Sequence, residues 1–351
     1  MKILYSGGGT LGSVSPLIAV HQKLSSEKNY QALWLGTSSG PEKSLVAKQN
    51  IPFQSIASGK FRRYFDFKNI LDIFKILVGL WQAFFIILKF QPQIILTSGS
   101  FVSVPVVWAA WALGKPVFIH QQDIRVGLAN KLMLPFATKI TVALEKSLAD
   151  FPKNKTVLVG NPLRQEAFQI KPSQLDKFNL NKDLPLVLVM GGGTGALSLN
   201  KIVADSLDGL TKICQVVHLT GKEKNETNKD YSNYFPLEFV TDEIFALIKS
   251  ANLVISRAGM STVTELAYFS KPTIFVPLPN SHQEKNAEYF AEKKASIYLS
   301  QEDLTPEKIT EEIHALLLDK EKLAQLGENL HKIFVDYSGD KFVSLIKQII
   351  K

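Results

Sequence analysis

The two halves of this 351-residue chain open in the same way, and this repeat constrains the fold more than any other feature. The apolar run Ile3–Tyr5 leads into Gly7-Gly8-Gly9-Thr10, and Leu186–Met190 leads into Gly191-Gly192-Gly193-Thr194. A helix-like pattern follows each turn, and Pro16 suits the first turn of the first helix. A strand, a glycine-rich turn and a helix begin a doubly wound sheet. The repeat predicts an α/β protein with two Rossmann-like domains facing each other across a cleft.

Short apolar runs bounded by turn residues predict the other strands, because strands buried on both faces of a parallel sheet are continuously apolar. In the first half we expect strands at Gln31–Gly36, Gln93–Thr97, Pro116–His120, Lys139–Val142 and Thr156–Val159. In the second half we expect them at Ile213–Thr220, Glu238–Val240, Asn252–Ser256, Thr273–Pro277 and Ser296–Leu299. The break at Gly160-Asn161-Pro162 predicts a domain boundary, which divides the chain into residues 1–162 and a second domain from residue 163.

The composition narrows the class of partner. The net charge is +8 and the pI is near 9.2, which is compatible with nucleic acid, an anionic membrane surface or phosphorylated substrates. The charge is spread along the chain and no nucleic-acid motif is present, so we expect no nucleic-acid partner. The single Cys214 cannot form an intramolecular disulfide, which fits a reducing cytoplasm. The N-terminus runs directly into a strand, so we expect no signal peptide.

The segment Lys60–Gln91 is unusually rich in apolar and aromatic residues. Its longest nearly apolar stretch, Ile76–Leu88, has 13 residues, whereas a membrane-spanning helix needs roughly 20, so we do not predict a membrane span. One interpretation is a buried crossover helix. The other is an amphipathic element at a membrane surface, which the neighbouring Lys60, Arg62 and Arg63 favour. The two interpretations are compatible with each other.

The stretch Ser256–Leu266 carries the strongest local signal for a ligand. It follows the apolar run Leu253–Ile255, turns at Gly259 and enters a helix through Ser261 and Thr262. A helix N-terminus at the carboxyl end of a strand favours an anion. Glu265 follows within the first turns, where a carboxylate can accept hydrogen bonds from a ribose diol. The stretch predicts a nucleotide site, although an ordinary capped strand–turn–helix would show the same pattern.

Other nucleotide chemistries do not fit this sequence. Neither glycine-rich loop contains the Gly-Lys-Ser/Thr of a P-loop, and neither has a convincing Gly-x-Gly-x-x-Gly with a downstream acid. No Asp-x-Asp pair is available to hold a nucleotide through a divalent ion. We therefore expect no metal and no cofactor. A diphosphate would need helix N-termini and cations, and Arg164 and Arg257 are the candidates, with local packing as the alternative for Arg257.

Six motifs occur in order along the chain: Gly-Gly-Thr-x-Gly-x-x-x-Pro, His-x-Gln, Gly-Asn-Pro-x-Arg, Gly-Gly-x-x-Gly-Ala, Arg-Ala-Gly-x-x-Thr-Val-x-Glu-Leu-Ala and Pro-Leu-Pro…His-Gln-x-x-Asn-Ala. Together they resemble the motifs of the MurG family. The resemblance covers about residues 3–290. It implies a transferase that moves N-acetylglucosamine from its UDP sugar onto lipid I at the cytoplasmic face of the bacterial membrane. It also implies the GT-B arrangement, in which the last helix, residues 338–351, returns to the first domain and residues 163–337 bind the donor.

The resemblance also implies roles for individual residues. Glu265 would hold the ribose, the turn Met260-Ser261-Thr262-Val263-Thr264 would bind the diphosphate and sugar, and the backbone near Thr241 would read uracil. Around the donor it places Thr10, Leu11, Gly12, Asp123, Arg164, Gly193, Thr194, His282 and Gln283. Gly9, Thr10, Gly99 and Ser100 would border the acceptor. The Phe61–Leu88 region would help the protein sit on the membrane surface.

The chain departs from the family where the chemistry should occur. The family usually has His at Ser13, Glu at Gln121, Asn at Asp123, and Ser-Gln at Gly193-Thr194. An inverting displacement needs a base near the acceptor hydroxyl. Ser13 is a poor base, because its hydroxyl keeps its proton. Asp123 is ionised by default and could be the base or bind a sugar hydroxyl. His120 could also serve, although histidine at a strand end is often structural, and the reaction could lack a protein base of this kind.

Two other functions remain open from the sequence. The changes at Gln121, Asp123, Gly193 and Thr194 would permit another UDP sugar or another lipid acceptor, such as diacylglycerol. Ser13 would permit a non-catalytic UDP-sugar-binding protein. The donor motifs are intact, which favours an enzyme over the binding protein.

Overall fold

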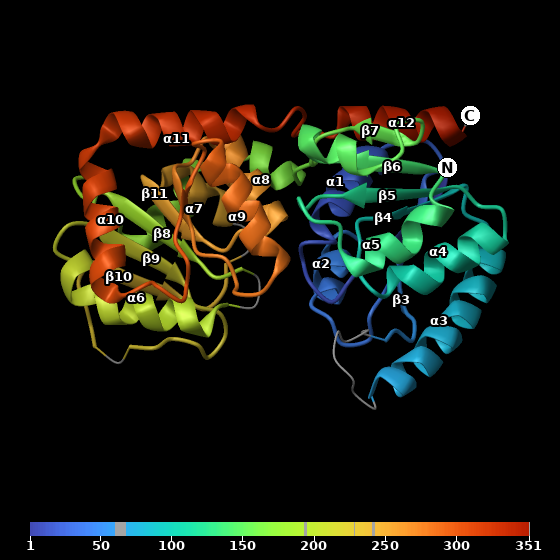
Figure 1. Ribbon diagram of the computed structural model, residues 1–351, viewed down its shortest axis with the longest axis horizontal. Helices are drawn as coiled ribbons and strands as arrows, with labels where there is room; N and C mark the ends of the chain where they lie inside the picture. The colour runs from blue at the N-terminus through green and yellow to red at the C-terminus, as the bar shows by residue number, and fades with distance from the viewer. Residues whose placement is uncertain (60–67, 193–194, 228, 241–242, 351) are drawn as a thin grey trace. The chain divides into compact units, whose positions relative to one another are not determined.

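The computed structural model describes residues 1–59, 68–192, 195–227, 229–240 and 243–350. The chain forms two compact units (Figure 1). Unit 1 comprises Met1–Arg164 and Val335–Lys351, and unit 2 comprises Gln165–Phe334. Both units have a parallel sheet with helices, so the prediction of two doubly wound α/β domains is confirmed.

Unit 1 contains a seven-stranded parallel sheet in the order β3-β2-β1-β4-β5-β6-β7. The strands are β1 (Lys2–Ser6), β2 (Gln31–Gly36), β3 (Phe53–Ser55), β4 (Ile94–Thr97), β5 (Val117–Gln121), β6 (Lys139–Val142) and β7 (Thr156–Leu158). The helices are α1 (Ser15–Leu24), α2 (Glu42–Lys48), α3 (Lys68–Phe90), α4 (Ser103–Ala112), α5 (Leu128–Met133) and α12 (Asp340–Ile350), with short 3-10 helices η1 (Leu134–Phe136) and η2 (Glu145–Asp150). The strand order reverses beside β1, which places the loops after β1 and β4 together at a switch point where α/β sheets bind ligands.

Alternation along the strands divides the core of unit 1 between the two faces of its sheet. Leu4 pairs in register with Ile95, and both belong to the cluster under α3, α4 and α5. The next pair, Tyr5 and Leu96, belongs to the opposite cluster with α1 and α12. Successive strand residues point to opposite faces, so a sheet that is apolar at every position must be covered on both. Figure 1 shows the helices on both sides of these strands.

The C-terminal helix α12 completes unit 1. Its buried residues Phe342, Val343 and Ile346 join the cluster of β1, β2 and α1. Two ion pairs tie its ends to the N-terminal segment, Lys23 with Asp340 and Lys347 with Glu27. The implied return of the last helix to the first domain is therefore confirmed.

Unit 2 contains a six-stranded parallel sheet in the order β10-β9-β8-β11-β12-β13. The strands are β8 (Leu186–Met190), β9 (Gln215–Leu219), β10 (Tyr234–Leu237), β11 (Leu253–Ser256), β12 (Thr273–Phe275) and β13 (Ile297–Tyr298). The helices are α6 (Leu197–Leu210), α7 (Ile244–Ser250), α8 (Met260–Tyr268), α9 (His282–Glu292), α10 (Pro306–Leu318) and α11 (Lys320–Lys332), with 3-10 helices η3 (Gln165–Phe168) and η4 (Pro172–Phe178). Cys214 is buried in the core of this unit.

One strand prediction is wrong in unit 2. The strand expected at Glu238–Val240 lies earlier, at β10 (Tyr234–Leu237), and Phe239 is 64% exposed. β10 is an edge strand and contains Pro236, which an edge position tolerates because one side of the strand needs no backbone donor. Because proline is uncommon in strands, the sequence pattern did not indicate a strand at Pro236. The apolar pair Phe239-Val240 led us to predict the strand in the loop that follows.

Helix α3 is buried on one face only. Leu80, Ala83, Phe84 and Ile87 pack toward the core that includes α4. The opposite side, which we call the exposed α3 face, has side chains that are 41–63% exposed: Ile73, Phe74, Leu77, Val78, Trp81, Phe85 and Leu88. The buried-crossover interpretation therefore holds for the inner face alone. By length and composition Asp72–Phe90 could also cross a membrane, contrary to our prediction from its shorter apolar stretch, but its inner face packs within unit 1.

Candidate functional site

The loop after β1 presents its tip to solvent and anchors its two ends. Trp34 donates from Nε1 to the carbonyl of Gly7 at 2.9 Å, and Gln122 donates from Nε2 to the carbonyl of Gly12 at 3.0 Å. Between these anchors Gly9 and Thr10 are exposed, while Leu11 and Gly12 are partly exposed. This loop, residues 7–12, which we call the arch, is therefore held at both ends by hydrogen bonds, and its exposed backbone can contact a ligand.

The loop after β4 contacts this arch. Ser100 donates from Oγ to the carbonyl of Gly8 at 2.8 Å. Gly99 and Ser100 have φ values of +94° and +93°, a region that a non-glycine residue such as Ser100 rarely adopts. Ser13, at the other end of the arch, lies 3.5 Å from the carbonyl of Gly8 and 3.4 Å from that of Thr10. The structure thus brings the loop that carries Gly9, Thr10 and Ser13 into contact with the loop that carries Gly99 and Ser100.

His120 lies beneath this edge of the sheet and is fully buried. Its Nδ1 lies 3.0 Å from Thr141 Oγ1, and its Nε2 lies 3.0 Å from Asn161 Oδ1. Burial lowers the pKa of His120 to about 4, so the ring is neutral at physiological pH. Both ring nitrogens are engaged in hydrogen bonds with protein groups, and this geometry favours a structural role for His120 over acceptance of a proton from a substrate.

Gln121 organises the loop after β5. It is 2% exposed, its Nε2 donates to the carbonyl of Asp123 at 2.6 Å, and its Oε1 accepts from Asn130 at 2.6 Å. A carboxylate here, as is usual in the family, could not make the donation to the Asp123 carbonyl. Asp123 itself is partly exposed at the end of β5. Gln121 therefore fixes the backbone that carries Asp123.

In unit 2, the turn from β11 into α8 has the geometry of an anion site. The N-cap residue is Gly259, which has no side chain to satisfy the first backbone N–H groups of α8. Asn286, fully buried on α9, donates from Nδ2 to the carbonyl of Ala258 at 3.0 Å. Thr264 donates to the carbonyl of Met260 at 2.7 Å, so its hydroxyl is used within the helix. The Asn286 contact thus holds the turn, and no N-cap side chain bonds the first backbone N–H groups of α8.

Glu265 and the start of α9 flank this turn in sequence and structure. Glu265 lies on α8 and is 8% exposed. Gln283 accepts from the backbone N–H of Leu278 at 3.1 Å, which ties the first turn of α9 to the loop after β12. His282, the first residue of α9, is exposed. The donor-side residues thus lie in the first turns of two helices that follow the neighbouring strands β11 and β12: Met260–Glu265 in α8, and His282 and Gln283 in α9.

Arg257 has a structural role. Its guanidinium donates to the carbonyls of Val276 and Pro277 at 2.8 and 2.9 Å, and to Gln301 and Ser198 at 2.6 and 3.2 Å. These four acceptors hold the guanidinium inside unit 2, so the packing interpretation is correct and Arg257 is not placed as a phosphate ligand. Arg164, the last residue of the first segment of unit 1, is partly buried.

Three predicted donor residues, Gly193, Thr194 and Thr241, lie outside the described residues. Among the residues that the structure describes, no group of three or more His, Cys, Asp or Glu side chains could hold a metal ion. The sequence analysis assigned no role to Gln122, Asn286 or Glu42. The first two belong to the motifs His-x-Gln and His-Gln-x-x-Asn-Ala, whereas nothing local marks Glu42 as a residue that holds a loop.

The comparisons with known proteins agree along the chain. The glycosyltransferase family 28 N-terminal domain matches residues 3–142, and the glycosyltransferase family 28 C-terminal domain matches residues 186–348. A UDP-N-acetylglucosamine--N-acetylmuramyl-(pentapeptide) pyrophosphoryl-undecaprenol N-acetylglucosamine transferase of Clostridium novyi is 37% identical, covering 100% of this chain and 99% of its own. A protein of the same name from Lachnospira eligens is 38% identical, covering 99% and 98%.

Among solved structures, MurG of Acinetobacter baumannii matches with a TM-score of 0.74 at 25% identity and covers 99% of both chains. A UDP-GlcNAc 2-epimerase from Neisseria meningitidis has the same TM-score at 12% identity, which reflects the fold alone. The two domain matches and the full-length relatives lead to one conclusion. The chain belongs to glycosyltransferase family 28 and, within it, to the MurG family.

Proposed function

We propose that this protein transfers N-acetylglucosamine from UDP-N-acetylglucosamine to lipid I, which gives lipid II for peptidoglycan synthesis. The observation that carries the proposal is the full-length similarity to transferases that bear this name, at 37–38% identity. The N-terminus of α8, whose N-cap is Gly259, and Glu265 on the same helix support binding of a nucleotide donor.

On the donor side, the backbone N–H groups of Met260–Thr264 bind the diphosphate, because a helix N-terminus carries positive partial charge. Glu265 accepts hydrogen bonds from the ribose, and Gln283 and His282 contact sugar hydroxyls. Arg164 lies on the donor, and Gly193, Thr194 and the backbone near Thr241 complete the nucleotide site. The charge that develops on departing UDP is stabilised by the same N–H groups.

On the acceptor side, the loops after β1 and β4 border the lipid diphosphate through Gly9, Thr10, Leu11, Gly12, Gly99 and Ser100. The acceptor hydroxyl attacks C1 of the sugar, the bond from C1 to the UDP oxygen breaks, and the anomeric centre inverts. Asp123 takes the hydroxyl proton, because it is the partly exposed carboxylate at the end of β5. His120 and Ser13 position the surrounding loops, since their polar atoms face backbone or buried groups.

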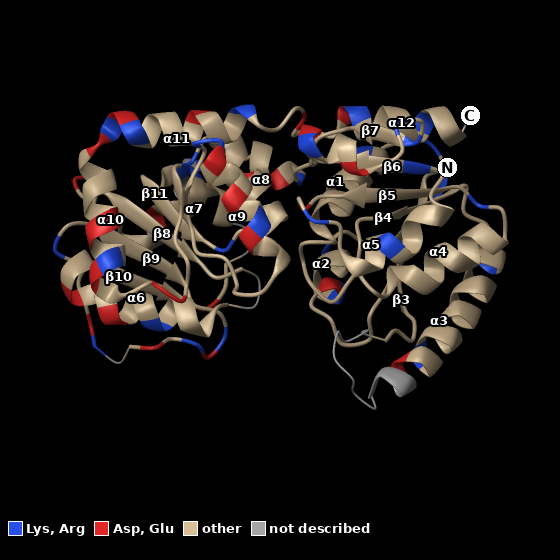
Figure 2. Cartoon of the chain, in the orientation of Figure 1, with Lys and Arg blue, Asp and Glu red and all other residues tan. Residues whose placement is uncertain are grey.

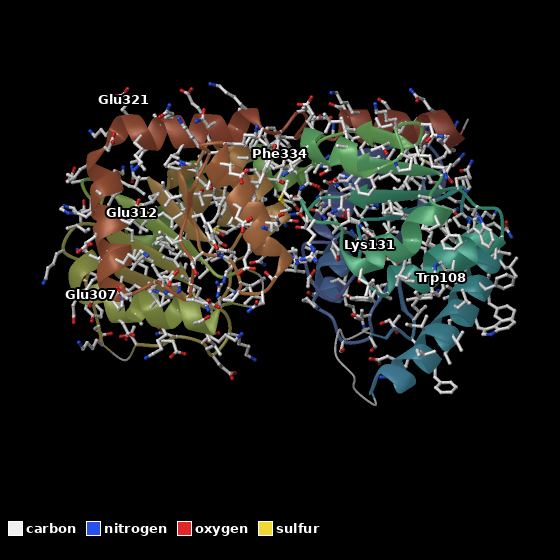
Figure 3. The ribbon with its side chains drawn as sticks, viewed as in Figure 1. Trp108, Lys131, Glu307, Glu312, Glu321 and Phe334 are labelled. Atoms are coloured by element: carbon white, nitrogen blue, oxygen red, sulfur yellow. The ribbon has the colours of Figure 1, made fainter. Side chains whose placement is uncertain are left out.

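The exposed α3 face is the candidate site for binding to the membrane. The exposed α3 face places seven large apolar side chains in solvent on one helix. Figure 2 shows that α3 has few charged residues along its length, and Figure 3 shows aromatic rings that project from it. A monomeric soluble protein rarely exposes such a surface, and an apolar helix face of this kind suits contact with a membrane that carries a lipid-linked acceptor. We infer that this face binds the membrane peripherally, and the resemblance to the MurG family implies the cytoplasmic side.

The test measures transfer of labelled sugar from UDP-N-acetylglucosamine to a soluble lipid I analogue. The parent protein is compared with the variant Asp123→Asn. Asp183→Asn, which changes an aspartate in an exposed turn, is the matched control. We expect turnover by the parent and the control, and a loss of about 10²-fold or more in kcat for Asp123→Asn, in line with the removal of a general base. Parent turnover with diacylglycerol and not with lipid I, or preference for UDP-glucose, would replace the proposed substrates. Donor binding without turnover on either acceptor would contradict an enzymatic function.

A further inference from the structure

The buried carboxylate of Glu42 is the least expected polar group in unit 1. Glu42 is the first residue of α2 and is fully buried. Its carboxylate accepts from the backbone N–H of Gly9 at 3.0 Å, from the backbone N–H of Thr37 at 2.7 Å, and from the Thr37 hydroxyl. Removing a carboxylate from water is unfavourable unless hydrogen-bond donors such as these compensate it, so a carboxylate at this position is retained for its hydrogen bonds.

The backbone around the carboxylate is shaped to admit it. A Cβ atom on Gly8 would lie 2.2 Å from Glu42 Oε1, and one on Gly40 would lie 1.9 Å from Oε2. A Cβ atom on Gly36 would lie 3.2 Å from Oε1. A side chain at Gly8 or Gly40 would therefore displace the Glu42 carboxylate from its position. The glycine-rich loop encloses an internal anion on one side and leaves its other side for a ligand.

The Gly8–Gly9 peptide unit is held at both ends. Its N–H, that of Gly9, donates to Glu42 at the start of α2, the helix that follows β2. Its carbonyl, that of Gly8, accepts from Ser100 in the loop after β4 at 2.8 Å. β2, β1 and β4 are neighbours in the sheet, so their carboxyl-end loops meet here. A peptide plane with both polar groups engaged cannot rotate without breaking a hydrogen bond, and this fixes the direction of the following exposed residues, Gly9 and Thr10.

We infer that Glu42 is a positioning residue for the transfer reaction: together with Ser100 it fixes the Gly8–Gly9 peptide plane and so presents the backbone of Gly9–Gly12 to the acceptor diphosphate. This inference rests on the proposed function for the identity of the acceptor. Glu42 contacts no substrate, and its effect passes through the loop. Sequence position gives no indication of this role, because Glu42 lies 33 residues from the peptide that it holds.

The test compares Glu42→Gln, Ser100→Ala and the double variant with the parent. The glutamine is nearly isosteric, but it turns an N–H₂ donor toward the N–H of either Gly9 or Thr37. Lys43→Gln, the exposed next residue on α2, is the matched control. We measure kcat and KM for the lipid I analogue, the Kd of UDP-N-acetylglucosamine, and hydrogen exchange of the backbone amides of residues 8–12.

We expect Glu42→Gln to lower acceptor kcat/KM by about tenfold or more, since misplacement of about 1 Å can cost 10²-fold. Donor Kd should stay within about twofold, and amides 8–12 should exchange about tenfold faster. The double variant should lose less than the product of the single losses, because both residues hold one peptide. Lys43→Gln should match the parent in every measurement.

Unchanged acceptor kinetics with unchanged exchange would overturn the inference, as would strictly multiplicative losses in the double variant. A parallel loss of donor binding would also overturn it, because it would indicate general destabilisation. A parent that binds donor and does not use lipid I would refute the proposed function instead. In that case the exchange of amides 8–12 would still decide whether Glu42 holds the loop.

Discussion

Asn286 donates a hydrogen bond from its side-chain amide to the carbonyl of Ala258 at 3.0 Å, and this contact ties α9 to the turn that begins α8. Asn286 is fully buried, and Ala258 immediately precedes the N-cap residue Gly259. The orientation of the first N–H groups of α8 therefore depends on a residue 28 positions later in the chain. The same helix, α9, also carries the sugar-side candidates His282 and Gln283.

Replacing Asn286 by Ala should weaken donor binding. The substitution leaves the Ala258 carbonyl without this donor, which costs about 1–3 kcal/mol, and it lets the turn relax. We expect the Kd for UDP-N-acetylglucosamine to rise about tenfold by titration calorimetry, with acceptor KM unchanged. Asn329→Ala is the control, since Asn329 also donates to a backbone carbonyl, that of Lys294, on the surface. Equal donor affinity in parent and Asn286→Ala would contradict this role for the turn.

Removing the Glu265 carboxylate should also act on the donor. Glu265→Ala should raise donor KM by about tenfold to a hundredfold, because hydrogen bonds to a charged group contribute about 1.5–3 kcal/mol. The loss should be smaller for a donor analogue that lacks the ribose hydroxyls, and steady-state kinetics with both donors measures the difference. Glu312→Ala, on α10 of the same unit (Figure 3), serves as the control. The assignment fails if both donors lose equally.

Charges on the exposed α3 face should abolish membrane binding without affecting chemistry. Trp81 and Phe85 are 63% and 61% exposed, and each contributes about 2 kcal/mol when it enters an apolar phase. Trp81→Glu/Phe85→Glu should reduce co-sedimentation with phosphatidylglycerol vesicles by about a hundredfold or more, while turnover of a soluble acceptor is kept. Leu318→Glu, at a 74% exposed apolar site in unit 2, should bind vesicles like the parent. Undiminished vesicle binding by the double variant would exclude this face as the membrane contact.

The buried His120 should make the protein less stable at acidic pH. Burial lowers its folded-state pKa to about 4, below the unfolded value near 6.5. Between these values the unfolded chain binds the proton and the folded chain does not. The contribution of His120 to the free energy of unfolding is therefore fully present above pH 6.5. It decreases by about 3 kcal/mol as the pH falls toward 4. His120→Gln should flatten this slope in thermal unfolding from pH 7.5 to 4.5, whereas exposed His314→Gln should keep it. An equally steep slope in His120→Gln would assign the acid sensitivity to other groups, such as His218, whose pKa burial also lowers to about 4.

Several parts of this protein could be predicted from local sequence. The runs Ile3–Tyr5 and Leu186–Met190 are continuously apolar because both faces of their sheets are covered, and the glycine turns that follow them allow a close approach of backbone. The glycine turn at Gly259, which follows an apolar run, likewise predicted the start of a helix from neighbouring residues alone. Predictions were weaker at edges. β10 was misplaced because Pro236 is tolerated only at a sheet edge, and the exposed side of α3 could not be separated from its buried side without knowing that α4 covers the latter.

The sequence by itself thus determined the two doubly wound sheets, the turns at their carboxyl edges and the family. Only the tertiary structure decided which polar groups satisfy one another. It assigned Arg257 to four internal acceptors, His120 to Thr141 and Asn161, and Glu42 to the Gly8–Gly9 peptide. The physical reason is that strand formation and turning depend on residues a few positions apart. A buried charge or ring nitrogen instead finds its partner across neighbouring strands, and the order of strands is a property of the whole fold.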